Sequence, residues 1–194
     1  MRFRSILVST AVVLTAAVIF VLWIDGPLGN NFHPVVQGEF YRSAQMSHSD
    51  LTKYIEQYHI QTVINLRGDS EKSWYRDEVL AAQKAGVVYR TVKLSAVSLP
   101  SRRILSSIID YLRQGPYPVL VHCHGGADRS GLVSALFLMA IKNRPLKEAR
   151  EQLSIRYGHI PGGQAHAMED FFALYEQSSN GKKIVDWVQE DYER

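Results

Sequence analysis

The stretch that decides the fold covers residues 122–131 and reads HCHGGADRSG. It contains the chain's only cysteine, Cys123, and it separates two apolar segments. Residues 117–121, before it, form a short run rich in β-branched side chains, which is typical of a buried strand. Residues 132–141, after it, are apolar on every side and long enough for a buried helix. The sequence therefore predicts a strand, a tight loop and a helix in that order.

The predicted loop suits a phosphate group. A helix N-terminus presents unpaired N–H groups and the positive end of the helix dipole, both of which attract an anion. Gly125 and Gly126 lack a Cβ, so the backbone before the helix can curl its N–H groups around an oxyanion. Cys123 would then lie at the bottom of a phosphate-binding cup.

Three side chains of this stretch carry chemistry. A helix N-terminus and a nearby cation favour the thiolate of Cys123, which is the nucleophilic form of a cysteine. Arg129 has a planar fork of N–H donors that can bind two phosphate oxygens, and Ser130 can donate a hydrogen bond to the sulfur. Two other interpretations are a buried, inert cysteine and a metal site built from residues 122–124. The second is disfavoured, since consecutive strand residues point to opposite faces and no further ligand cluster follows.

Cys123, five intervening residues and Arg129, preceded by His122 and followed by Ser130, resemble the signature of the cysteine-dependent protein tyrosine phosphatase superfamily. The bacterial branch that resembles dual-specificity phosphatases fits best. The resemblance implies that Cys123 attacks phosphorus to form a phosphocysteine, that Ser130 helps the thiolate leave and that His122 tunes the thiolate. It assigns phosphate binding to the backbone of His124, Gly125, Gly126, Ala127, Asp128 and Arg129. We expect no cofactor and no metal ion.

The general acid of this family is missing from its usual place. Most relatives carry an aspartate a few residues before a proline on a separate loop, and the matching residues here, 94–100, contain no acid. Asp128 is the favoured replacement because some relatives use an aspartate just before this arginine. Two alternatives stay open: Asp69 donates the proton, or Asp128 only caps the helix or pairs with a cation.

Apolar patterning outside the motif predicts strands and helices in alternation. Such alternation indicates an α/β fold, with a mostly parallel central sheet flanked by helices and its site at the carboxyl end of a strand. Arg42 and Arg67 lie in stretches that also resemble this family, and each is either a structural residue or a substrate contact. The expected strands cover residues 35–41 (at an edge), 62–66, 87–94 and 117–121. The expected helices cover 51–58, 74–85, 104–112, 132–141, 145–153 and 168–175.

The N-terminus predicts a membrane anchor. Residues 6–24 contain no charged side chain, and at about 1.5 Å per residue they span a hydrocarbon core of about 30 Å. Because Arg2 and Arg4 precede them, we expect a single pass through the bacterial inner membrane with an extracytoplasmic catalytic domain; secretion after signal cleavage is the alternative. The predicted parts are a cytoplasmic N-terminus (1–5), the anchor (6–24), a linker (25–31) and the phosphatase domain (32–194).

Charge and composition narrow the substrate class. The formal net charge of +3 comes largely from Arg2 and Arg4, without which 20 basic residues face 19 acidic ones, so we expect no nucleic-acid partner. The loop lacks the lysines that would bind extra phosphates of a polyphosphorylated inositol. The expected substrate is phosphotyrosine on a protein, or a mono-phosphorylated small molecule or lipid. The alternative function is a pseudophosphatase that binds phosphate without turnover.

Overall fold

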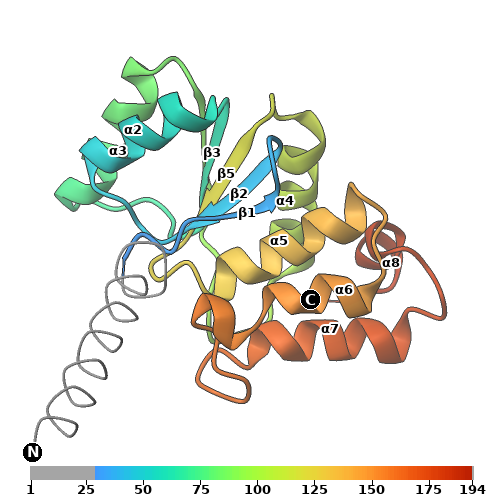
Figure 1. Ribbon diagram of the computed structural model, residues 1–194. Helices are drawn as coiled ribbons and strands as arrows, with labels where there is room; N and C mark the ends of the chain where they lie inside the picture. Colours follow the sequence, from blue (N-terminus) through green and yellow to red (C-terminus); the bar gives the residue numbers. More distant parts are fainter. Residues whose placement is uncertain (1–28, 194) are drawn as a thin grey trace, which may run out of the picture.

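The computed structural model describes residues 29–193, and within them the chain forms a five-stranded sheet in the order β1-β2-β5-β3-β4 (Figure 1). β1 and β2 pair antiparallel, whereas the other three neighbouring pairs are parallel. The predicted α/β class with a mostly parallel central sheet is confirmed. The strands are β1 (His33–Val36), β2 (Phe40–Ser43), β3 (Thr62–Asn65), β4 (Val88–Thr91) and β5 (Val119–His122).

Helices cover both faces of the sheet (Figure 1). One face carries α2 (His48–Tyr58) and α3 (Ser73–Lys84). The other face carries α4 (Arg102–Gln114), α5 (Asp128–Ala140), α6 (Leu146–Ala149), α7 (Ala167–Ser178) and α8 (Ile184–Glu190). Two short 3-10 turns, Arg150–Gln152 and Ile155–Tyr157, lie between α6 and α7.

Strand β5 contributes side chains to two separate cores, because successive residues of a strand point to opposite faces. Val119 and Val121 pack in the core beneath α4, α5, α7 and α8, whereas Leu120 packs in the core beneath α2 and α3. His122 therefore points to the same face as Leu120, toward α3. Cys123 follows at the carboxyl end of the strand.

Helix α5 begins earlier than its apolar pattern predicts. The apolar run starts at Leu132, but the helix begins at Asp128, so its first turn consists of polar residues. Every residue from Ser130 to Met139 is buried, because α5 lies between the sheet and the C-terminal helices. The strand–loop–helix arrangement is confirmed, and Arg129 and Ser130 lie in the first turn of the helix.

The predicted edge strand over residues 35–41 is only partly correct, because β1 does lie at an edge of the sheet but ends at Val36. The structure instead forms a hairpin of β1 and β2, which pair His33 with Arg42. Gly38 has a φ of 78°, a left-handed conformation that glycine adopts readily, and it lies in the turn between the two strands. β2 is fully buried because it pairs on its other side with β5.

The predicted localisation needs correction. Among residues 29–193, no helix is long and apolar enough to cross a bilayer. The longest helices of this part, α4 and α5, have 13 residues each and reach about 20 Å, less than a hydrocarbon core of about 30 Å. The predicted anchor, residues 6–24, lies outside the described residues. As a correction, we no longer retain the single-pass inner-membrane placement with an extracytoplasmic domain, or the membrane contact that it implied.

Candidate active site

Cys123 lies at the carboxyl end of β5, which is the central strand of the sheet, and the following loop leads into α5. Its side chain is buried, and its Sγ lies 3.5 Å from the Oγ of Ser130. The N–H groups of the first helical turn have no partner within the helix and point toward this end of the loop. The structure thus brings together the thiol, the hydroxyl and the helix N-terminus that the sequence predicted.

The backbone of the loop is held with its carbonyl groups facing outward. In a trans peptide the carbonyl and the following N–H point in opposite directions. The N–H groups of residues 125–128 therefore face the other side of the loop, and we call this N–H side of residues 124–128 the cup. The four carbonyls accept hydrogen bonds as follows: His124 from the Gln45 N–H at 3.1 Å, Gly125 from Asn31 Nδ2 at 2.9 Å, and Gly126 and Ala127 from Arg42 Nη2 at 2.9 and 2.7 Å.

Arg42 is a structural residue of the cup. It comes from β2, is fully buried, and also donates from Nη1 to the carbonyl and the side-chain oxygen of Gln152, at 2.7 and 3.0 Å. Its guanidinium lies 4.1 Å from the centre of the Tyr157 ring. Burial lowers the pKa of Arg42 to about 10, so the group stays charged near neutral pH. Of the two possibilities left open for Arg42, the structure supports the structural one.

The two loop glycines differ in what the fold requires of them. Gly126 has a φ of 70°, and a Cβ there would lie 2.6 Å from the backbone nitrogen of Ala44. A Cβ at Gly125 would meet nothing within 4 Å. Only at Gly126 does the close approach of the loop to β2 exclude a side chain.

We expect Gly126→Ala to lower the free energy of unfolding by about 2–4 kcal/mol, the sum of left-handed strain and a backbone clash. Gly125→Ala is the matched control and should change it by less than about 1 kcal/mol. Chemical denaturation of both variants measures the difference. Equal stabilities would contradict the role assigned to Gly126.

A buried carboxylate, that of Glu78, lies close to the residue before Cys123. Glu78 of α3 forms an ion pair with Nε2 of His122, accepts a hydrogen bond from Gln45, and accepts another from the Tyr89 hydroxyl at 3.0 Å. Burial acts to raise the pKa of Glu78, but the charge of His122 and these hydrogen bonds hold it below its usual value. These contacts thereby fix the side chain of His122, the residue directly before Cys123.

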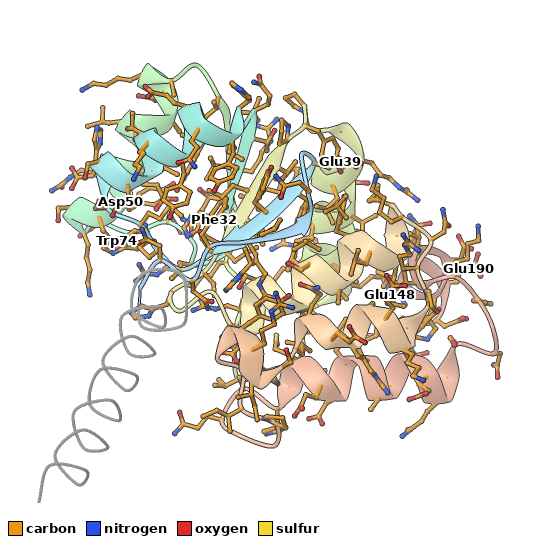
Figure 2. All side chains as sticks on the ribbon, viewed as in Figure 1. Phe32, Glu39, Asp50, Trp74, Glu148 and Glu190 are labelled. Carbon is orange, nitrogen blue, oxygen red and sulfur yellow. The ribbon has the colours of Figure 1, made fainter. Side chains whose placement is uncertain are left out.

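Two arginines lie near the cup. Arg129 Nη1 lies 3.5 Å from the carbonyl of Leu66, and its buried Nε has no hydrogen-bond partner within residues 29–193. Arg67 stacks on Trp74 with its guanidinium 3.8 Å from the ring centre, and it donates to Gln45 Oε1 at 3.0 Å. Trp74 lies at the start of α3, on the face of the sheet that α2 and α3 cover (Figure 2). Burial and then the charge of Arg129 lower the pKa of Arg67.

Asp128 is the first residue of α5, and its side chain is 31% exposed. It does not cap the helix, whose N-cap residue is Ala127. Instead its Oδ1 lies 2.7 Å from Nδ1 of the fully buried His159. Asp69 is exposed in the loop after β3.

The chain matches a known protein family. A family model described as the tyrosine phosphatase family matches residues 26–145, which is more than half of the chain. The chain belongs to this tyrosine phosphatase family. The resemblance inferred from Cys123 and Arg129 is confirmed, and the chain is an enzyme of the cysteine-dependent phosphatase class. No curated protein matches the chain.

Solved structures show that this phosphatase shares its fold with others. TpbA of P. aeruginosa is 20% identical with a TM-score of 0.53, over 70% of this chain and 80% of its own. PTPMT1 is 18% identical with a TM-score of 0.56, over 76% of this chain and 98% of its own. Tk-PTP in its active form is 23% identical with a TM-score of 0.56, over 73% of this chain and 96% of its own.

Several residues that shape the site of this phosphatase were not predicted from its sequence. Asn31, in the predicted linker, is fully buried and donates to the carbonyls of Gly125 and Tyr157, each at 2.9 Å. Glu78 and His159 come from other distant parts of the chain. The one sequence signal for Glu78 is its residue type, and a carboxylate on a predicted helix is common on exposed surfaces. Residues 157–159 do resemble a stretch of this family, but that resemblance assigned His159 no role.

Proposed function

We propose that this phosphatase hydrolyses phosphomonoesters through a phosphocysteine intermediate on Cys123. In the first step Sγ attacks phosphorus, the bond from phosphorus to the ester oxygen breaks, and a proton from Asp128 neutralises the leaving oxygen. In the second step water attacks phosphorus, Asp128 takes back a proton, and the sulfur–phosphorus bond breaks while Ser130 donates a hydrogen bond to the departing thiolate.

The observation that carries this proposal is that buried Cys123 directly precedes a loop whose carbonyls are all held by Gln45, Asn31 and Arg42. The outward hydrogen bonds of the carbonyls of residues 124–127 support phosphate binding by the N–H groups of residues 125–128. The unpartnered Nε of Arg129 supports a role in binding phosphate oxygens, because buried donors are rarely left unpaired. His122, held by Glu78, is proposed to tune the thiolate.

We further propose phosphotyrosine, or a mono-phosphorylated small molecule of similar size, as the substrate class. Residues 124–129 of the loop contain one arginine and no lysine, so the loop itself offers little to additional phosphate groups. Ile155 and Ile160, at 74% and 71% exposure, lie in the same segment as His159 and provide apolar surface near the cup. A structure of TpbA with serine in place of a cysteine was determined with phosphotyrosine bound, which supports this choice.

The test compares two substrates with different leaving groups. The unmodified protein should release phosphate from both 4-nitrophenyl phosphate and phosphotyrosine. Asp128→Asn should slow phosphotyrosine hydrolysis by about 10²-fold, since a general acid contributes about 10²–10⁴-fold, and should slow the activated ester much less. Equal losses with both substrates would exclude Asp128 as the proton donor. Phosphate binding by the unmodified protein without any turnover would favour a pseudophosphatase instead.

A further inference from the structure

Asp128, the proposed proton donor, lies at one end of a row of three side chains. The other two side chains, His159 and Glu169, have no role in the chemistry proposed above. His159 lies in the middle of the row and is fully buried, while Asp128 and Glu169 at its two ends are about one-third exposed. Nδ1 of the ring lies 2.7 Å from Asp128 Oδ1, and Nε2 lies 3.5 Å from Glu169 Oε1. The ring therefore reaches from the loop side of α5 to α7.

The position of His159 is fixed by the backbone around it. Gly158 has a φ of 82°, which turns the chain inward, and the N–H of His159 donates to the carbonyl of Ser154 at 3.1 Å. The Glu169 carboxylate accepts from the N–H of Gly162 at 2.8 Å, so it ties the loop after His159 to α7. The imidazole is thus held from both sides before any substrate binds.

A packing role alone does not explain a histidine here. Its Nε2 is buried and makes no hydrogen bond within the described part of the chain, which is costly for a polar atom. The contact of Nε2 with the Glu169 carboxylate, at 3.5 Å, is an ion pair only when the ring is protonated. An apolar side chain would fill the same space without that cost. The one short polar contact of the ring is the contact to Asp128.

We propose that His159 is a positioning residue that orients Asp128 for proton transfer, an inference that rests on the proposed function. The Nδ1–H of His159 donates to Oδ1 of Asp128, which fixes the plane of the carboxyl group and leaves Oδ2 to carry the proton toward the leaving oxygen. Without this bond the carboxyl group can rotate toward neighbouring cations, of which Arg129 is the next residue. Misplacement of a reacting group by about 1 Å can cost about 10²-fold in rate.

The experiment uses three variants of His159. The amide nitrogen of asparagine can occupy the place of Nδ1, that of glutamine can occupy the place of Nε2, and leucine keeps neither. We expect His159→Leu and His159→Gln to slow phosphotyrosine hydrolysis by about 10–100-fold, with a much smaller loss on 4-nitrophenyl phosphate. His159→Asn should recover most of the rate. The fall in rate at alkaline pH should become less steep in the Leu and Gln variants. We expect the same change in Asp128→Asn.

A double variant separates positioning from a general loss of structure. Adding His159→Leu to Asp128→Asn should cause no further loss on phosphotyrosine, because the group being positioned is already gone. A further loss, or an asparagine variant no better than glutamine, would overturn the proposal. If the leucine variant does not fold, the comparison of asparagine with glutamine still decides. If Asp128→Asn shows no dependence on the leaving group, the proposed acid itself is wrong, which is distinct from a failure at His159.

Discussion

Cys123→Ser is expected to lower kcat/KM for 4-nitrophenyl phosphate by at least about 10⁴-fold, the order seen when a nucleophile is removed from an enzyme. Serine fits the buried space of the thiol, but its hydroxyl ionises far less readily than a thiol. The one hydrogen-bond partner of the sulfur that the structure shows is the Ser130 hydroxyl at 3.5 Å, which is no base. The variant should still bind phosphate, because the N–H groups of the cup are unchanged.

Acid quench with radiolabelled substrate is the second measurement for this prediction. The unmodified protein should retain label as an acid-stable phosphoenzyme during turnover, and Cys123→Ser should retain none. Thermal unfolding of the variant controls for folding and should stay within a few degrees of the unmodified protein. A serine variant that keeps one-tenth or more of the activity would refute nucleophilic attack by Cys123.

Arg42→Met is expected to be the most destabilising substitution near the site, at roughly 3–5 kcal/mol of unfolding free energy. It leaves three carbonyls without a donor, those of Gly126, Ala127 and Gln152, and each unsatisfied buried group costs about 1–3 kcal/mol. Activity should fall together with stability. Without Arg42 the loop carbonyls are no longer held outward, so the loop N–H groups no longer face inward. Arg42→Lys should rescue little, because one ammonium group cannot reproduce the planar fork.

Arg67→Met is the matched control for Arg42. Arg67 is partly exposed and its stacking on Trp74 contributes about 0.5–1 kcal/mol, so this variant should lose no more than about 1 kcal/mol. Denaturant titration of both variants compares the two arginines directly. Similar losses at the two positions would show that Arg42 does not hold the cup.

Most of the fold could be predicted from the sequence because its elements depend on local patterns. The strand before Cys123, the helix after it and the alternation of the remaining elements follow from apolar periodicity and from turn residues. The hairpin of β1 and β2 was missed, since residues 35–41 were interpreted as one strand and the left-handed conformation of Gly38 is known only from the structure. Helix α8 was also missed, because its seven residues form only two turns.

By itself the sequence determined the loop that carries the proposed nucleophile, since Cys123, the glycines and Arg129 lie within seven consecutive residues. The tertiary structure alone decided what surrounds that loop. Asn31 reaches Gly125 across 94 residues and Arg42 reaches Ala127 across 85, while His159 reaches Asp128 across 31. No local pattern encodes such contacts, because they form only when the parallel strands bring their carboxyl ends to one edge of the sheet.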